Sequence, residues 1–426
     1  MPKLIRSESE DGSQPNVPVP QGLRRGFVEA VRFGEQLLIS RCHKRSKDRN
    51  MSDIKSIVFV VPYIFERVES LAESLYLVSG IKPHVITFRT EDETLVSGNY
   101  SSVQVGSIET LVRQIKSLAP HIVHNITKYF DMTTVTLLKS NIQFHYDYKD
   151  IFIDQLLITN EEVELHRHIL RAMLQRGIPF SYRDGRYNVV AKSLGFLHPT
   201  GYFLPEFITK HQYDSLLNVL QPNTSADRRS DIVFIGNFSL ETLNPEQAGV
   251  GQIAIVRCLI EQGLKYTVYP KQTSGRTMED FREYIELANT NETFDYASTL
   301  SRTDLHLALP NYGWGSFLQP YNHFPNLANK IFFKTPSLGL PGRAADYIGS
   351  GLPILVSGVN NPELNDWVDL YGIGLNITGA EIYCLNQLIK TVDYVKLRRN
   401  VTEFATKLLS PYKQGSNLVS AYEKFQ

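Results

Sequence analysis

The sequence predicts an α/β protein made of two Rossmann-like, doubly wound domains that face each other across a cleft. Short apolar runs rich in β-branched residues, such as "IKSIVFVV" at residues 54–61, are typical of strands buried on both faces of a parallel sheet. Helix-like segments alternate with these runs, which favours right-handed βαβ units. The alternation stops at a polar stretch and then begins again, and 426 residues are enough for two cores.

The first domain is expected at residues 52–205. Its expected strands are residues 54–61, 84–89, 121–125 and 142–148, and its expected helices are 66–80, 108–120 and 132–140. Pro120 is expected to end the helix at 108–120. Residues 206–228 are polar and without a clear period, so they are expected to be the linker.

The second domain is expected at residues 229–395, followed by C-terminal helices at 396–426 that break near Pro411. Its expected strands are "DIVFIGNF" (231–238), "KYTVYP" (265–270), "DLHLALP" (304–310) and "PILVS" (353–357), with helices at 251–263, 278–289 and 341–351. Ligands of open parallel sheets bind beyond the carboxyl ends of the strands, so both domains are expected to contribute those ends to the cleft.

Composition excludes several classes of function. The 44 basic and 44 acidic side chains balance, so no net field attracts the chain to nucleic acid. Cys42, Cys258 and Cys384 form no cluster, which indicates a reducing compartment and argues against structural zinc. No apolar run reaches the roughly 18–20 residues that span a bilayer. We therefore expect a cytoplasmic protein.

The first 51 residues differ from the rest of the chain. Residues 1–22 are rich in Ser and Pro and are expected to be disordered. Residues 22–49 have approximately helical apolar spacing and an excess of basic side chains, which is typical of a helix that lies on a membrane surface. A helix docked on its own domain, or a leader before an internal start at Met51, is an equally valid interpretation.

The stretch "PGRAADYIGSGLP" at residues 341–353 is the main candidate for chemistry. Pro341 and Gly342 are expected to open a helix, whose free amides and positive dipole end would lie beside Arg343. A guanidinium and amides together suit a diphosphate. Asp346 lies one turn on and is suited to accept hydrogen bonds from ribose hydroxyls. Spacing alone is equally consistent with a surface ion pair between Arg343 and Asp346.

The same stretch resembles the P-x-[K/R]-x-x-[E/D]-Y-x-x-[A/S]-G-x-P signature of nucleotide-sugar glycosyltransferases with the GT-B fold, especially glycosyltransferase family 4. The matching residues are Pro341, Arg343, Asp346, Tyr347, Ser350, Gly351 and Pro353. "DIVFIGNF", "DLHLALP" and "NPELNDWVDLYGIGLNI" are similar to the segments around that signature. The resemblance implies that Arg343 meets the donor diphosphate, that Asp346 meets the ribose, and that anomeric configuration is retained.

The sequence departs from the family pattern at four places. Lys and Glu are commoner in the family at the positions of Arg343 and Asp346. The position eight before Asp346 is Leu338, where the fuller pattern has a second glutamate. The turn after the first strand, "VVPYIFER", contains no glycine.

Further candidates for donor binding follow predicted strands of the second domain. Gly236 and Asn237 would let backbone approach a phosphate, although an ordinary strand-ending turn has the same pattern. Lys271 is placed to reach the diphosphate, although exposed lysines are common. Tyr312 or Trp314 would stack on a base or sugar, although loop aromatics more often pack internally.

In the first domain, His124 and Asn125 end one predicted strand, and the run from His145 to Asp147 ends the next. The acceptor is expected there, and His124 is the candidate general base, although histidines at strand ends are often structural. No Asp-x-Asp motif occurs, so neither a metal nor another cofactor is expected.

These observations predict a glycosyltransferase that moves a sugar from a nucleoside diphosphate sugar to a hydroxyl of a glycan, lipid or protein, metal-independent and retaining. We expect a UDP-sugar hexosyltransferase of polysaccharide biosynthesis. A nucleotide-sugar epimerase with the GT-B fold would share the nucleotide site, but it needs acid and base carboxylates that are not identified. A non-catalytic binding or assembly protein is the third possibility, because the first glutamate of the family pattern is missing.

Overall fold

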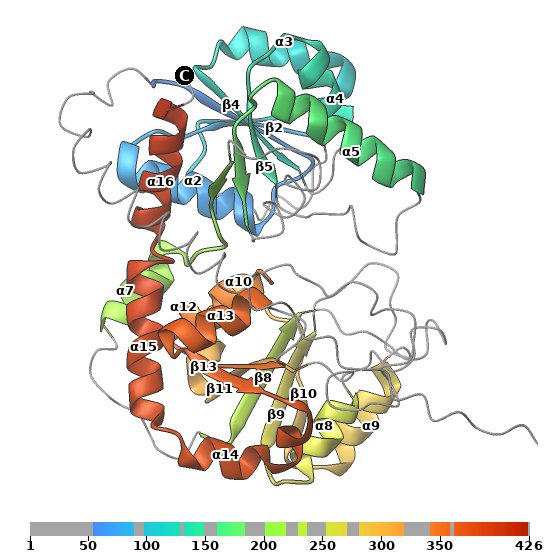
Figure 1. Cartoon of the computed structure of the whole chain (residues 1–426), viewed down its shortest axis with the longest axis vertical. Coiled ribbons are helices and arrows are strands. Elements are labelled where there is room, and N and C mark those ends of the chain that lie inside the picture. The colour runs from blue at the N-terminus through green and yellow to red at the C-terminus, as the bar shows by residue number, and fades with distance from the viewer. Residues whose placement is uncertain are drawn as a thin grey trace, which may run out of the picture. The chain divides into compact units, whose positions relative to one another are not determined.

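The computed structural model, drawn in Figure 1, describes most of the chain after residue 53. The described residues are 54–88, 98–127, 132–148, 160–183, 201–218, 229–236, 253–270, 281–318, 341–357 and 362–424. The predicted leader and basic helix at residues 1–51 lie outside them. No helix in the described ranges combines the length and apolar character that crossing a bilayer requires.

The first sheet has seven parallel strands in the order β3-β2-β1-β4-β5-β6-β7. Its strands are β1 (Ile57–Val61), β2 (His84–Thr87), β3 (Ser102–Val105), β4 (Ile122–Thr127), β5 (His145–Tyr148), β6 (Phe180–Tyr182) and β7 (Gly201–Phe203). Its helices are α2 (Glu66–Ser79), α3 (Ile108–Leu118), α4 (Met132–Lys139) and α5 (Asn160–Gln175). All five residues of β1 are buried, as the continuous apolar run predicts for a central parallel strand.

The second sheet has six parallel strands in the order β10-β9-β8-β11-β12-β13. Its strands are β8 (Asp231–Gly236), β9 (Lys265–Pro270), β10 (Phe294–Tyr296), β11 (Trp314–Phe317), β12 (Ile354–Ser357) and β13 (Gly374–Ile377). Its helical elements are α8 (Ile253–Ile260), α9 (Arg282–Thr290), α10 (Arg302–Ala308), η5 (Leu309–Asn311), α12 (Arg343–Gly349), α13 (Pro362–Tyr371), η8 (Gly379–Cys384) and α14 (Leu385–Thr391). The strand order reverses between β8 and β11, which makes that point the topological switch of the sheet.

The fold class is therefore as predicted, but the third predicted strand of the second domain is wrong. "DLHLALP" forms helix α10, and the strand is the following segment, Trp314–Phe317. The Ser301 hydroxyl caps this helix by accepting a hydrogen bond from the Asp304 amide at 3.1 Å. Alternating apolar residues over a short window fit either structure, and the cap favours the helix.

Short strands at the sheet edges were also not predicted. Only one residue of β10 is buried, and β3 has no buried residue, so neither shows the apolar run that marks the central strands. β6 and β7 are three residues each, which is too short for a period to be recognised.

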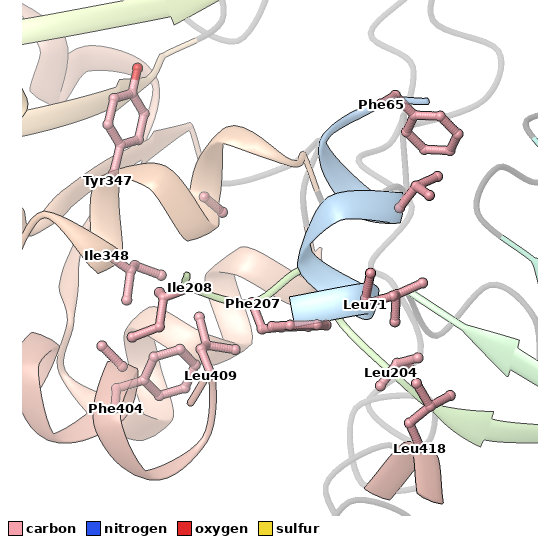
Figure 2. Close-up of a cluster of buried hydrophobic side chains, with 14 of the residues drawn as sticks. Phe65, Leu71, Leu204, Phe207, Ile208, Tyr347, Ile348, Phe404, Leu409 and Leu418 are labelled. Carbon is pink, nitrogen blue, oxygen red and sulfur yellow. The ribbon is translucent and has the colours of Figure 1, made fainter. Parts of the chain in front are cut away.

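The segment predicted as a linker contains ordered structure. Residues 210–218 form helix α7 (Lys210–Asn218), which contacts α12 and α15. Phe207 and Ile208 are buried in a cluster with side chains of α2, α12 and the C-terminal helices (Figure 2). The apolar residues just before α7 explain why this part of the segment packs instead of remaining a solvated connection.

The two C-terminal helices are α15 (Tyr394–Lys407) and α16 (Pro411–Lys424), and the break lies where Pro411 predicts it. α16 lies along α2 of the first sheet (Figure 1). At Gly415 a Cβ atom would lie 2.4 Å from the Ser74 carbonyl oxygen, so only glycine allows this close approach of the two helices. The end of the chain is thus part of the first sheet's covering layer.

Candidate active site

The carboxyl end of β8 is held by two side chains of α12. The Ile235 carbonyl accepts a hydrogen bond from Arg343 Nη1 at 3.2 Å, and the Ile235 amide donates to the Tyr347 hydroxyl at 2.9 Å. Both polar backbone groups of one residue are therefore bonded to the same helix. This arrangement fixes Arg343 at the edge where parallel sheets bind ligands.

Gly236 is the last residue of β8 and lies beside Arg343. Its φ is +113°, a backbone conformation that residues other than glycine rarely adopt. A Cβ atom on residue 236 would also lie 3.4 Å from Arg343 Nη1. The positive φ therefore requires glycine at the turn, whereas a Cβ there would make only van der Waals contact with the guanidinium.

The Arg343 guanidinium lies between two aromatic rings at the topological switch point. Its Cζ is 4.5 Å from the ring centre of Phe234 on β8 and 4.9 Å from that of Phe317 on β11. Burial lowers the pKa of Arg343, although a guanidinium remains charged at neutral pH. The rings stabilise the cation and restrict its orientation without neutralising it.

Within the described part of the chain, Arg343 has no acidic partner. Its Nε is buried and makes no hydrogen bond there, and none of the ion pairs formed by described residues includes it. The predicted alternative, an ion pair between Arg343 and Asp346, is not formed by these two described residues. A partly buried cation without a counter-charge favours an anionic ligand.

Asp346 instead contacts a residue that the sequence analysis did not select. Its Oδ1 lies 3.1 Å from Nε2 of His306, on α10. The Asp346 side chain is 23% exposed, so the carboxylate is accessible from solvent. Because "DLHLALP" was interpreted as a strand, no local signal connected His306 with Asp346.

The expected cradle of free amides at the start of α12 is only partly present. The amides of Ala344 and Ala345 donate to the carbonyls of Pro341 and Gly342 at 3.0 and 3.1 Å. These tight turns satisfy donors that the sequence analysis assigned to a phosphate. The positive charge at the site is therefore supplied mainly by the Arg343 side chain.

Tyr347, which the family resemblance also predicts as a donor-binding residue, packs inside the protein in this structure. The side chain is fully buried, and it fills the space above Gly315, where a Cβ atom would lie 2.4 Å from its ring. Burial raises the pKa of its hydroxyl, which is bonded to the Ile235 amide. Tyr347 packs α12 onto β8 and β11.

Tyr312 and Trp314, predicted as stacking residues that follow a strand, instead lie just before and at the start of strand β11. The adjacent Gly313 amide donates to the carbonyl of Asp231, the first residue of β8, at 2.8 Å. Both residues therefore belong to the amino-terminal edge of the sheet. Trp314 is fully buried, and the Tyr312 hydroxyl bonds that of Tyr269 at 2.9 Å. Asn237 and Lys271, also predicted at this site, lie outside the described residues.

His124, the predicted general base, is enclosed in the core of the first sheet. The ring is fully buried on β4, and its Nδ1 lies 2.6 Å from the Tyr422 hydroxyl of α16. Burial lowers the pKa of His124 to about 4, and that of the neighbouring His145 to about 3. A general base must reach its substrate, and α16 shields this imidazole. Both histidines are therefore neutral core residues at physiological pH.

A buried ion-pair network lies on the first sheet and was not predicted. Arg67 of α2 bonds both carboxylate oxygens of Asp147 on β5, and Ser181 donates to the same carboxylate at 2.7 Å. Glu206 accepts from Arg67 and Arg183 at 3.3 and 3.4 Å. Although burial alone raises the pKa of Asp147, Arg67 lowers it overall. A buried arginine on a helix has no sequence pattern that distinguishes it from a surface one.

Comparisons with known proteins support the fold. No protein-family model matches the chain, and no curated protein matches it in sequence. Among solved structures, sucrose-phosphate synthase from Thermosynechococcus elongatus is similar with a TM-score of 0.58 at 10% identity, over 87% of this chain and 99% of that one. Anabaena HepE in complex with UDP and glucose gives 0.55 at 12% identity over the same shares. An α,α-trehalose 6-phosphate synthase from Burkholderia multivorans gives 0.57 at 9%, again over 87% and 99%.

These likenesses, together with two parallel sheets covered by helices, show that the chain has the GT-B fold. The identities are too low to carry a particular activity from those proteins to this one.

Proposed function

We propose that the chain is a glycosyltransferase that moves a sugar from a nucleoside diphosphate sugar to a hydroxyl acceptor. The observation that carries this proposal is the Arg343 guanidinium, held at the switch point of the second sheet without an acidic partner among the described residues. A diphosphate supplies the missing negative charge, and Asp346, one helical turn away, suits the adjoining ribose.

The difficult step of such a transfer is departure of the nucleoside diphosphate, because negative charge grows on its phosphates. A cation already oriented at that place stabilises the transition state more than the ground state. Phe234 and Phe317 restrict the guanidinium in advance, so little reorganisation is needed. A preorganised donor of this kind contributes roughly 3–4 kcal/mol.

UDP-hexoses are the first donors to test. HepE was crystallised with UDP and glucose, which supports a UDP-sugar for a chain of the same fold. We further propose a metal-independent, retaining reaction in cytoplasmic polysaccharide biosynthesis, with possible acceptors in glycans, lipids or proteins. NMR of the product anomer tests retention, and activity in EDTA tests metal independence. Sedimentation with anionic vesicles tests the predicted membrane contact of residues 22–49.

Incubation with labelled UDP-, GDP- and dTDP-sugars, with and without acceptors, tests the function directly. Transfer or slow hydrolysis of a donor supports the proposal. Isomerised donor identifies an epimerase, and nucleotide binding without turnover identifies a non-catalytic protein. The matched control for Arg343→Ala is Arg257→Ala, which removes an exposed arginine paired with Glu283. Loss of turnover in the first variant alone is the expected result.

A further inference from the structure

The pair formed by His306 and Asp346 connects two helices of the second sheet. His306 lies in the last turn of α10 and its side chain is only 6% exposed, whereas the Asp346 side chain is 23% exposed. Nε2 of the imidazole is 3.1 Å from Oδ1 of the carboxylate. The buried His306 imidazole therefore holds one oxygen of the more accessible Asp346 carboxylate.

The Asp346 carboxylate has no other hydrogen-bond partner among the described residues. Oδ2 makes no hydrogen bond there, and Arg343 is directed to Ile235 instead. The backbone carbonyl of Asp346 accepts from the Ser350 amide at 3.1 Å, so the main chain of the residue is fixed by the helix. The remaining freedom of the carboxylate is rotation about its own bonds, which is broad for aspartate.

Helix α10 is itself held in place. Leu305 packs against the large buried cluster, and the Arg302 guanidinium donates to the Glu66 carbonyl at the start of α2 at 3.4 Å. Arg302 and His306 are four residues apart and share one helix face. His306 is thus presented from a supported element.

We propose that His306 is a positioning residue for nucleotide binding, which fixes the Asp346 carboxylate so that Oδ2 meets the ribose hydroxyls. This inference rests on the proposed function of the site. A carboxylate oxygen accepts hydrogen bonds, so Nε2 of the imidazole carries a hydrogen and donates this hydrogen bond to Oδ1. Holding the acceptor in its bound orientation removes an ordering cost when the nucleotide arrives.

The test separates contact with the ribose from general damage to the site. Calorimetric titrations compare UDP with 2′,3′-dideoxy-UDP, and GDP with its dideoxy counterpart, on wild type, His306→Leu and His306→Gln. We expect His306→Leu to weaken binding of the ribonucleotide about tenfold and to leave the dideoxynucleotide unchanged. Glutamine retains a donor, so His306→Gln is expected to recover much of the affinity. The control is His211→Leu, an exposed position on α7, expected to change neither.

Three results would overturn the inference. In the first, His306→Leu weakens binding of the ribonucleotide and the dideoxynucleotide equally, which indicates only structural damage. In the second, His306→Leu weakens binding of neither nucleotide. In the third, wild type binds ribo- and dideoxynucleotides equally, so Asp346 does not meet the ribose. A fourth result, a wild type that binds none of UDP, GDP and dTDP, refutes the proposed function and this inference with it. Should His306→Leu not fold, His306→Ala replaces it in the same comparison.

Discussion

Arg67 and Arg343 are two arginines on helices that pack against the two parallel sheets, and their surroundings differ in one respect. Arg67 donates to Asp147, Glu206 and the carbonyls of Leu204 and Pro205, so every nitrogen of its guanidinium is used. Arg343 donates to one carbonyl and contacts two rings. Carboxylates compensate the charge of Arg67, whereas no described carboxylate compensates the charge of Arg343.

We propose that this difference separates a structural cation, Arg67, from a ligand-binding one, Arg343. A buried charge with complete pairing stabilises the fold and has no capacity left for a ligand. A partly buried charge without a counter-charge costs stability and is typical of sites that recognise anions. Removing each arginine should therefore produce opposite effects on stability and activity.

The largest expected effect is on stability, in Arg67→Met. The substitution leaves Asp147 buried with its main partner lost, which should lower the free energy of unfolding by about 3–5 kcal/mol. Urea denaturation measures this loss. The double variant Arg67→Met/Asp147→Leu should recover much of it, because an apolar pair no longer leaves a buried charge. Arg167→Met, which removes an exposed arginine paired with Glu164, should change stability by less than about 0.5 kcal/mol.

The next effect is on activity, in Arg343→Ala. We expect turnover of the nucleotide-sugar to fall about 100- to 1000-fold, the usual result of removing one hydrogen-bond donor to the transition state. The midpoint of urea unfolding should change little, because no described carboxylate loses its partner. Donor kinetics together with unfolding curves check both statements. Equal loss of stability in Arg343→Ala and Arg67→Met would remove the distinction between the two sites.

Acid should lower the free energy of unfolding through protonation of His124 in the first sheet. Its pKa is lowered from the model-peptide 6.5 to about 4, so the neutral form is favoured by folding. The stability from this group is complete above about pH 6.5 and is lost as the pH falls towards 4, on the order of 3 kcal/mol in all. Urea unfolding between pH 7.5 and 4.5 should show a shallower decline for His124→Asn than for wild type. Parallel declines would contradict the assignment.

The smallest effect is expected at Gly236. Alanine there requires a strained φ, at a cost of about 1–3 kcal/mol, and places its Cβ against Arg343 Nη1. Both stability and nucleotide affinity should fall. Gly263 provides the matched control, because its φ is +74° and nothing lies within 4 Å of a Cβ there. Gly263→Ala should lose stability without losing affinity.

The sequence predicted those parts of the molecule that have a local pattern. The central strand β1 is a continuous buried run, and the break at Pro411 follows from the geometry of proline. Arg343 and Asp346 were found because the signature stretch places them on one short helix. Gly236 was found because it follows a strand.

Contacts between distant segments had no such pattern. Arg67 and Asp147 are 80 residues apart, and His124 meets Tyr422 across 298 residues. His124 was predicted at a strand end, but β4 continues to Thr127 and Tyr422 of the C-terminal helix packs on His124 within the strand, which no neighbouring residue indicates. Tyr312 was predicted to follow a strand because "DLHLALP" fits a strand pattern. That segment is helical, so Tyr312 lies before strand β11 and not after a strand.

The central claim is that Arg343 is charged and available for a diphosphate. Calorimetric titration of wild type and Arg343→Ala with UDP and with uridine tests it most directly, since the two ligands differ only in the diphosphate. We predict that wild type binds UDP much more tightly than uridine, and that Arg343→Ala loses most of that difference while it still binds uridine as wild type does. An Arg343→Ala variant that binds UDP with wild-type affinity would contradict the claim.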